Sequence, residues 1–388
     1  MIDFDLDDEL ELIRGTARQF AADHLRPRLR DNEKARGVPD ATREAFAEIG
    51  FQGLECPESL GGSGFGALAR CLVMEELGAA DPGAALALDG LGTALYPLAE
   101  LGGEDALVRF ARPILEGAGT RAVLVWTGEG TRAQIDTRGD TLRGRIPWVP
   151  AERVDLLVLL DEEGCRVVEG GVVEGGVVES GVRCLPVRGS GLRAAGAAEI
   201  QLEEAKVAAH FRGEEGAQRS LARARLYATS LLVGVMRESA LFSRQYALDR
   251  VAFGKPIAHH QALAFLIADM ATAVDSCRLL AFEAACRIEK VRENESLDDE
   301  NPASAGEAAE AAATAFLEAA EQAMFVTPNG IQILGGHGFM QDYPVEKMMR
   351  EARAISLVLG GVELAREHAG RELAAREGNI PLCLEASA

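Results

Sequence analysis

The feature that most constrains the fold is a change of hydrophobic period along the chain. Up to about residue 120, apolar residues recur at three- and four-residue spacing, which is typical of amphipathic helices. Short β-type runs separated by turns follow, such as Ala122–Thr127 and Val154–Leu160. The helical spacing then returns, over 221–251, 261–288, 308–325 and 345–357. We therefore expect a helical N-terminal domain (1–120), a middle β domain (121–213) and a C-terminal helical bundle (214–388).

Composition narrows the class of protein and its partners. The chain has 388 residues, 48% of them hydrophobic, and no apolar run reaches the length of a bilayer span, which predicts a soluble protein. The net charge of −21 argues against nucleic acid or an anionic membrane as a partner. The acidic N-terminus argues against a secretory signal peptide. Seven scattered cysteines, without CxxC or His/Cys pairs at metal spacing, predict a reduced cytoplasmic protein without a metal site.

Two stretches depart from both periods. Residues 167–182 repeat Val-Val-Glu-Gly-Gly with a five-residue period, and we interpret them as a lengthened strand–turn region. Residues 291–306 are acidic and are expected to form a solvated loop. The adjacent His259 and His260 lie in a helix-entry loop and are predicted to be surface residues rather than metal ligands.

A first candidate ligand-binding segment is Tyr246–Gln261, between two predicted helices. The Arg250 guanidinium can hold a diphosphate in a bidentate manner. Phe253 offers a flat apolar surface, and the Gln261 amide can bind a polar group. The alternative is that Arg250 caps its own helix and that Phe253 belongs to the core.

A second candidate segment runs from Gly330 to Gly361. Gln332, followed by Gly335 and Gly336, places an amide beside backbone that has no Cβ, which suits a phosphate or a ribose. His337, in the same glycine turn, is interpreted mainly as a structural residue. The segment ends at the glycine pair Gly360-Gly361, directly after Leu359.

In combination, these segments resemble the acyl-CoA dehydrogenase family, and most closely its medium- and short-chain members. Residues 51–64 are similar to the family's N-terminal loop signature. Residues 246–261 are similar to its Arg-x-x-Phe-Gly-x-Pro-Ile…Gln segment, and residues 332–350 to its Gln-Ile-Leu-Gly-Gly-x-Gly-Phe…Tyr-Pro-Val-Glu-Lys…Arg segment. The resemblance covers essentially the whole chain.

The resemblance implies an α-helical N-domain, a middle β-barrel or sandwich domain and a C-terminal four-helix bundle. It implies FAD held at a dimer interface, often within a tetramer that is a dimer of dimers. In the family a Glu removes the α-proton of an acyl-CoA thioester while the β-hydrogen leaves as hydride. The electrons then pass to electron-transferring flavoprotein. Fatty acid or steroid side-chain metabolism is the expected setting.

The catalytic position departs from the family's pattern. Leu359 occupies the position of the family's base Glu, with Val358 at the position of a Tyr and Gly361 at that of a Thr. Some members place the base on an earlier helix, directly before an Arg that matches Arg225, and here that position is Ala224. Loss of a general base typically costs a factor of about 10² to 10⁴ in rate. The resemblance therefore predicts no catalytic residue in this chain.

The β domain departs as well. The family's flavin-covering loop corresponds to 125–132, where Thr127 matches the family's Thr but the rest of the loop is shortened. Trp148 matches a strand aromatic, with a core role as the alternative, whereas the flavin-bonding Thr is replaced by Pro150, which has no N–H. The predicted cofactor-binding residues are Arg250, Phe253, Gln261, Gln332, Gly335, Gly336, Thr127 and Trp148.

These losses suggest a hypothesis for the role of the chain. In the family's dimers one chain supplies the base and the flavin-covering loop, while the partner supplies the Arg/Phe/Gln segment and the glycine turn. This chain keeps the second set and has lost much of the first. It is predicted to be a subunit that completes the FAD site of a homologous, base-bearing partner. The alternatives are a homo-oligomeric flavoenzyme with other chemistry, such as flavin-dependent monooxygenation, and a scaffold that binds no flavin.

Overall fold

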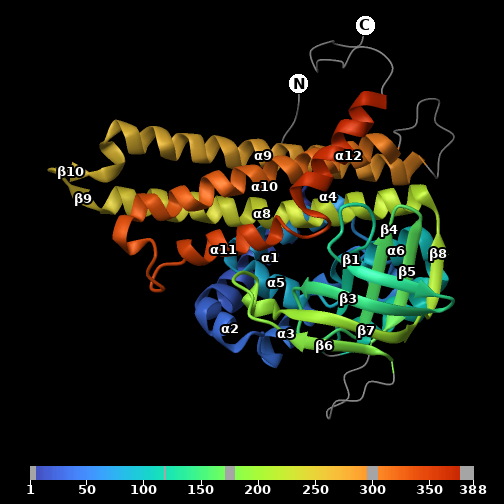
Figure 1. The fold of residues 1–388 in the computed structure, drawn as a ribbon. Coiled ribbons are helices and arrows are strands. Elements are labelled where there is room, and N and C mark those ends of the chain that lie inside the picture. The colour runs from blue at the N-terminus through green and yellow to red at the C-terminus, as the bar shows by residue number, and fades with distance from the viewer. Residues whose placement is uncertain (1–5, 118, 171–179, 295–304, 376–388) are drawn as a thin grey trace, which may run out of the picture.

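The structure is a computed structural model that describes residues 6–117, 119–170, 180–294 and 305–375. Helices come first, two β-sheets follow, and long helices complete the chain (Figure 1). The predicted fold class is therefore confirmed. Parts of the glycine-rich repeat (171–179) and of the acidic insertion (295–304) lie outside the described residues, so the predictions for those segments remain predictions.

The N-terminal helices pack around one that is buried on almost every side. They are α1 (Asp8–Phe20), α2 (Leu29–Ala35), α3 (Asp40–Glu48), α4 (Ala67–Ala80), α5 (Pro82–Leu88), α6 (Leu95–Ala106) and α7 (Arg112–Glu116). Nearly every residue of α4 is buried, including Arg70, Glu75 and Glu76, whose charges are paired with residues of neighbouring segments. Gly234 lets α4 approach its neighbour, since a Cβ there would lie 2.2 Å from the Glu75 carbonyl oxygen.

The β domain consists of two four-stranded sheets. One has the order β1-β4-β5-β8 and the other β2-β3-β7-β6. The strands are β1 (Ala122–Trp126), β2 (Gln134–Arg138), β3 (Thr141–Val149), β4 (Leu156–Asp161), β5 (Gly164–Glu169), β6 (Val182–Pro186), β7 (Ala198–Lys206) and β8 (Ala209–Arg212). β1 and β4 pair in parallel, whereas the other neighbouring pairs are antiparallel.

Strand β4 joins the β domain to the helices. Its side chains alternate between two cores, because successive residues of a strand point to opposite faces of a sheet. Leu157 and Leu159 belong to the core between the two sheets. Leu156, Val158 and Leu160 belong to the helical core. A strand buried on both faces reads as a continuous apolar run, which is why residues 156–160 are all Leu or Val.

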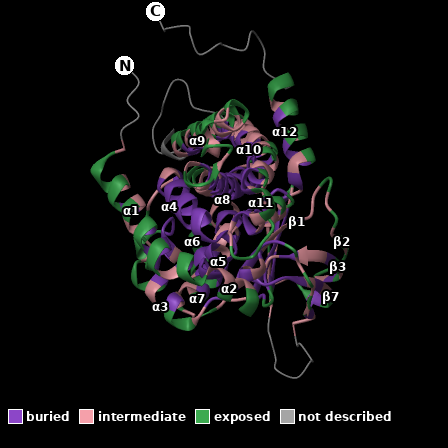
Figure 2. Ribbon diagram, turned by 90° about the vertical axis from the view of Figure 1, so that its left-hand side faces the viewer, coloured by how far each residue is buried: buried purple, intermediate pink, exposed green. Residues whose placement is uncertain are grey.

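The C-terminal part is built on the long helix α8, which is buried over most of its first two-thirds (Figure 2). Its helices are α8 (Glu214–Asp249), α9 (Gln261–Asn294), α10 (Ala305–Leu334), α11 (Val345–Ile355) and α12 (Gly361–Ala375). The short strands β9 (Val251–Ala252) and β10 (Lys255–Pro256) form a hairpin between α8 and α9. That hairpin lies at one end of the bundle, and the β domain packs toward the other end (Figure 1).

Several helices differ from the sequence-based expectation; α8 begins at Glu214 rather than at 221, and α9 extends to Asn294 rather than to 288. The helix expected to end at residue 325 continues through Pro328 to Leu334. Proline normally disrupts a helix interior, but Gly330 and Ile333 are buried beyond it, and Gly330 lies against Ser239 of α8. Helix α12 was not predicted. No helix in the described ranges is long and apolar enough to span a membrane.

Candidate active site and cofactor-binding residues

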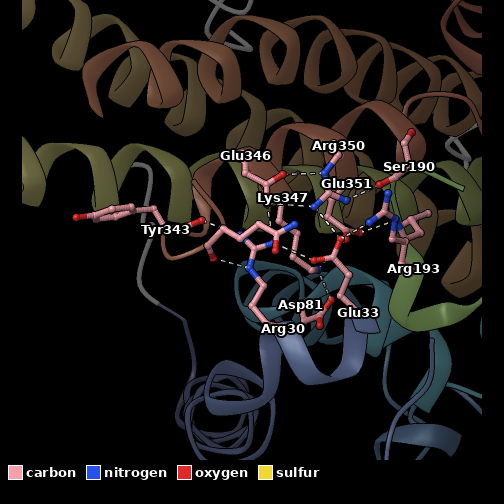
Figure 3. Close-up of polar contacts among 12 residues, drawn as sticks. Arg30, Glu33, Asp81, Ser190, Arg193, Tyr343, Glu346, Lys347, Arg350 and Glu351 are labelled. Atoms are coloured by element: carbon pink, nitrogen blue, oxygen red, sulfur yellow. Dashed lines mark hydrogen bonds and ion pairs between the residues drawn. The ribbon is translucent and has the colours of Figure 1, made fainter. Parts of the chain in front are cut away.

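Helix α11 leads into the candidate catalytic position and is anchored by a buried lysine (Figure 3). Lys347 Nζ lies 2.9 Å from Asp81 Oδ1 and 2.7 Å from Glu351 Oε1. Lys347 is only 1% exposed. Burial alone would lower the pKa of Lys347, but the charges of Asp81 and Glu351 outweigh burial and raise that pKa above its usual value. The lysine is therefore charged and ties α11 to the start of α5.

A second set of ion pairs holds the other side of α11. Arg350 Nη2 lies 2.7 Å from Glu33 Oε1, and Arg350 Nε lies 2.8 Å from Glu346 Oε2. Glu33 also receives Arg193 from the β domain, at 3.3 Å (Figure 3). Residues of α2, α11 and the β domain thus converge on Glu33. The end of α11 is therefore held against the N-terminal helices and against the β domain.

The turn after α11 has an unusual backbone. Leu359, Gly360 and Gly361 all have positive φ, at 56°, 83° and 73°. Glycine adopts this conformation readily, whereas for a residue with a Cβ it costs roughly 1–2 kcal/mol. Leu359 is buried, at 8% exposure. The turn therefore keeps a demanding geometry at the position where no catalytic side chain stands.

Leu359 separates two cavities. The larger, of about 500 Å³, lies between β1, β3 and the segment that joins α11 to α12, and Trp148 lines it. The smaller, of about 80 Å³, lies on the helical side and is lined by residues that include Ala224 and Arg121. Leu124, Pro150, Val358 and Leu359 border both cavities. Both expected base positions, 359 and 224, therefore lie at the smaller cavity.

The one carboxylate that lines the smaller cavity, Asp89, is fully engaged. Asp89 Oδ2 accepts hydrogen bonds from Arg70 Nη1 and from the Tyr227 hydroxyl, each at 3.1 Å. Asp89 Oδ1 accepts the Gly92 N–H at 3.0 Å. Arg70 is itself paired with Glu55. Asp89 therefore belongs to a buried charge network and is not free to act as a general base.

A third cavity, of about 470 Å³, lies between the β domain, the start of α8 and α12. Arg225 lines it and is 2% exposed, with Nη1 3.2 Å from His368 Nδ1. Burial lowers the pKa of Arg225 to about 9. Burial, together with the charges of Arg225 and Arg371, lowers the pKa of His368 to about 4. The same cavity is lined by five carboxylates, those of Asp161, Glu162, Glu214, Glu215 and Glu372.

The predicted cofactor residues of the bundle lie together at the hairpin end. Tyr246, at the end of α8, places its hydroxyl 2.8 Å from His337 Nδ1 in the glycine turn, and the His337 ring stacks on Tyr343. These contacts hold the glycine turn beside the segment 250–261. Arg250, Gln261, Gln332, Gly335 and Gly336 are all exposed there. None of the three side chains among them makes a hydrogen bond or ion pair with another described residue.

Phe253 stands out at the same end of the bundle. It is 95% exposed and has a φ of 54°. An aromatic residue with positive φ is a genuine outlier, and such strained residues cluster at functional sites. Phe265 and Phe339 are also largely exposed. Phe253 is therefore not a core residue, and neither burial nor a favourable backbone explains its position within the chain.

The comparisons with known proteins identify the family. Residues 7–118 match the family model described as acyl-CoA dehydrogenase, N-terminal domain, and residues 212–374 match acyl-CoA dehydrogenase, C-terminal domain. Together they cover well over half of the chain. The chain belongs to the acyl-CoA dehydrogenase family. Members of that family are FAD flavoproteins.

Relatives within the family match the chain along most of its length. Benzylmalonyl-CoA dehydrogenase of Aromatoleum aromaticum is 28% identical, over 93% of this chain and 96% of its own. The caffeyl-CoA reductase–Etf complex subunit CarC of Acetobacterium woodii is also 28% identical, over 90% and 94%. The structure of butyryl-CoA dehydrogenase from Megasphaera elsdenii superposes with a TM-score of 0.77 at 23% identity, covering 96% of this chain and all of that one.

The two predicted cofactor residues of the β domain lie in different places. Trp148 lines the cavity of about 500 Å³ beside Leu359. The Thr127 hydroxyl instead donates to the Leu160 carbonyl at 3.1 Å, and Thr127 lines a separate cavity of about 110 Å³. In the larger cavity the hydroxyls of Thr131 and Ser356 donate to carbonyls of their own chain. That cavity therefore offers an aromatic wall and the guanidinium groups of Arg132 and Arg353, which make no hydrogen bond or ion pair with another described residue.

Two features escaped the sequence reasoning, Arg121 and Asp89 beside the small cavity. Each stands at the edge of a predicted element without a motif around it, so no spacing marks it. His259 is exposed as expected, whereas His260 is half-buried and its Nε2 lies 3.2 Å from the Ala252 carbonyl oxygen. Among the described residues, no group of three or more His, Cys, Asp or Glu has a geometry that would hold a metal ion.

Proposed function

We propose that this chain is a subunit of a heteromeric acyl-CoA dehydrogenase, in which it completes the FAD site of a homologous partner that carries the base. The complex would oxidise an acyl-CoA thioester at its α,β-bond and pass electrons to electron-transferring flavoprotein. One observation carries the proposal. The proposed cofactor residues belong to the segments at the hairpin end of the bundle (Figure 1), whereas the cavity at Leu359 is lined by β1, β3 and the turn after α11. One chain therefore does not bring both sets to the same flavin. Because neither position 359 nor position 224 carries a carboxylate, we assign the base to a homologous partner rather than to a second copy of this chain.

The residues at the hairpin end fit the diphosphate and adenosine part of FAD. The Arg250 guanidinium is exposed and unpaired, so it can donate two parallel hydrogen bonds to a diphosphate. A Cβ built at Gly335 or Gly336 would meet nothing within 4 Å, so a ligand can reach that backbone. The side-chain amides of Gln261 and Gln332 make no hydrogen bond with another described residue. FAD, when bound, would supply the acceptor for the hydride of the thioester's β-carbon.

The chain's own cavity lacks what the reaction needs. No carboxylate stands at position 359 or 224, and Asp89 is held by Arg70 and Tyr227. Five of the fourteen residues that line the cavity of about 470 Å³ near Arg225 carry carboxylates, which would repel the phosphates of coenzyme A. Arg371, the second cation there, is paired with Glu129 and Glu367. These charges favour a role in which acyl-CoA binds to the partner.

The exposed aromatic residues support a subunit contact at the hairpin end. A contiguous exposed apolar patch on a folded protein marks an interaction site, and we propose that three exposed phenylalanines contribute to such a patch. Phe253, Phe265 and Phe339 are 95%, 61% and 74% exposed. The name of one relative, the caffeyl-CoA reductase–Etf complex subunit, describes a family member within a complex that includes electron-transferring flavoprotein. We extend that partner to the present chain as part of the proposal.

The test is co-expression with a base-bearing homologue encoded by a neighbouring gene. We expect a stable complex whose flavin content is lower than one per chain and whose acyl-CoA oxidation needs both subunits. In the complex, Arg250→Gln should weaken FAD binding by about 10- to 100-fold, because a charge-assisted hydrogen bond is worth about 1.5–3 kcal/mol. Arg145→Gln, at an exposed arginine of β3, is the matched control and should leave flavin content unchanged.

Three outcomes would contradict the proposal. A homo-oligomer with one flavin per chain that oxidises acyl-CoA unaided would show that the partner is unnecessary. A homo-oligomer that consumes oxygen with reduced flavin would favour the monooxygenase alternative. A protein that stays colourless with every homologous partner would favour the flavin-free scaffold.

A further inference from the structure

The segment between α10 and α11 carries the glycine turn, and an arginine of the N-terminal helices holds it. Arg30 of α2 donates hydrogen bonds from Nε to the Gln341 carbonyl at 2.9 Å and from Nη2 to the Tyr343 carbonyl at 2.7 Å. Because Nε and Nη2 lie on one edge of the planar guanidinium, a single side chain binds two carbonyls of this segment. Arg30 therefore fixes the backbone that follows the glycine turn.

The guanidinium of Arg30 is itself held in place by two carboxylates. Its Nη1 lies 2.8 Å from Glu33 Oε2 and 2.7 Å from Glu346 Oε1 (Figure 3). Glu33 is in turn paired with Arg350 of α11 at 2.7 Å. The Arg30 side chain is only 29% exposed, and hydrogen bonds from a charged donor are stronger than neutral ones. The two carbonyls of the segment are therefore placed by a side chain with little freedom of its own.

Tyr343 connects this arginine to the glycine turn. Its ring points away from the ion pairs (Figure 3) and stacks on His337, with the ring centroids 5.2 Å apart and the planes at 12°. His337 Nδ1 also lies 2.8 Å from the Tyr246 hydroxyl at the end of α8. Within the turn, the Gly338 N–H donates to the Gly335 carbonyl at 2.9 Å. A continuous set of contacts therefore runs from α2 to the turn.

The glycines of the turn depend on such contacts for a fixed conformation. Gly335 has a φ of 56°, and a Cβ built at Gly335 or Gly336 would meet nothing within 4 Å. Glycine has the greatest backbone freedom of all residues, so an open glycine pair is costly to order. A ligand that binds such a backbone bears that entropic cost unless other contacts have already ordered it. The contacts from Arg30 to His337 supply that order in advance.

We propose that Arg30 is a positioning residue for the glycine turn, which it holds through Tyr343 and His337 in the conformation that receives the diphosphate of FAD. The identity of the ligand rests on the proposed function, whereas the positioning is measured on this chain alone. The predicted cofactor residues lie in the bundle and the β domain. The N-terminal domain therefore contributes to a cofactor site through a residue that does not contact the cofactor.

The first measurement is amide hydrogen exchange of the full-length chain, comparing residues 335–343 with α9. In Arg30→Met we expect faster exchange over 335–343, because both carbonyl contacts are lost, and unchanged exchange in α9. Arg30→Lys keeps a cation but loses the planar fork, so its exchange over 335–343 should lie between that of the wild type and that of Arg30→Met. Arg28→Met, at an exposed arginine two residues away, is the matched control and should exchange as the wild type does.

The second measurement is FAD binding by the complex with the base-bearing partner. Arg30→Met should raise the dissociation constant of FAD by about 10-fold, the lower end of the range expected for Arg250→Gln, because Arg30 acts through the turn. His337→Ala should weaken FAD as well. The double variant should bind FAD about as weakly as the weaker single variant, because both substitutions release the same turn. A purely structural role of Arg30 would instead multiply the two effects.

Three results would overturn the inference. They are unchanged exchange over 335–343 in Arg30→Met, an equal increase in Arg28→Met, and effects of Arg30→Met and His337→Ala on FAD binding that multiply. A complex that does not form, or that binds no flavin, would refute the proposed function. The exchange measurement on the chain alone would still decide whether Arg30 holds the turn.

Discussion

Replacing Lys347 by Met tests how strongly the buried ion pairs hold α11 in place. The substitution keeps an unbranched apolar side chain but removes the ammonium that lies 2.9 Å from Asp81 and 2.7 Å from Glu351. Asp81 and Glu351 are 0% and 1% exposed, so both would be left as buried carboxylates without a counterion. Breaking a buried pair in this way costs about 3–5 kcal/mol. We expect the free energy of unfolding at pH 7 to fall by that amount.

The pH dependence of the free energy of unfolding is a second, independent test of the same ion pairs. In Lys347→Met, burial would raise the pKa of Glu351 further above its unfolded-state value, as burial already raises it in the wild type, because the lysine charge that opposes this shift is gone. The native variant would then bind more protons than its unfolded chain, so its stability should rise as the pH falls from 7 to 5. The difference in free energy of unfolding between the wild type and Lys347→Met should therefore become smaller from pH 7 to pH 5.

The assay is urea unfolding at pH 7 and pH 5, monitored by the fluorescence of Trp126 and Trp148. Lys206→Met, at an exposed lysine of β7, is the control and should change stability by no more than about 0.5 kcal/mol. The triple variant Lys347→Met/Asp81→Asn/Glu351→Gln removes all three charges and should recover much of the loss. A loss below about 1 kcal/mol at pH 7, or a deficit that widens at pH 5, would refute the reasoning.

Two other predictions follow from single residues. The pKa of His368 is lowered to about 4 in the folded protein, so between that pH and about 6.5 the folded imidazole stays neutral while the unfolded one takes up a proton. The free energy of unfolding is therefore unaffected by this group above about pH 6.5 and falls as the pH drops toward 4. Between pH 7 and pH 4.5 the free energy of unfolding should therefore fall by about 1–2 kcal/mol less in His368→Asn than in the wild type, a figure that allows for the partial exposure of the ring. Urea unfolding of both proteins at the two pH values measures this difference. Because Leu359 has a positive φ, Leu359→Gly should be more stable than Leu359→Ala by about 1 kcal/mol. Within a helix the order of these two residues is the reverse. Equal stability of the two variants would contradict the left-handed turn.

The order of domains could be predicted because hydrophobic period reports which face of an element is buried. The continuous apolar run of β4 and the spacing in α8 both follow from burial that the structure shows. The end of α10 was missed because Pro328 is a local signal for termination, whereas the burial of Gly330 and Ile333 against other helices is a tertiary effect. Helix α12 was missed because it begins within the glycine pair that marks the preceding turn.

The candidate site could be predicted only where motifs carry it. The segments around Arg250 and Gln332 have characteristic spacings, and the contact between Tyr246 and His337 places them at one end of the bundle. Arg121 is different, because its importance depends on a missing partner. A sequence states which groups are present but not which are left without a hydrogen bond. The Nε and Nη1 groups of Arg121, closed to solvent without a partner among the described residues, are therefore visible only in three dimensions.

The open cavities beside Leu359 are themselves an argument that the chain binds something there. A cavity costs about 24 cal/mol per Å³, so the small one alone corresponds to about 2 kcal/mol. Ala224 and Ala228 line it, and larger side chains at either position would fill the space. Arg121 adds two N–H groups, Nε and Nη1, that are closed to solvent and have no hydrogen-bond partner among the described residues. The leucine at position 359 explains neither cost, since larger apolar side chains around it would give a better filled core. A ligand that occupies the volume and accepts a hydrogen bond from Arg121 would offset both.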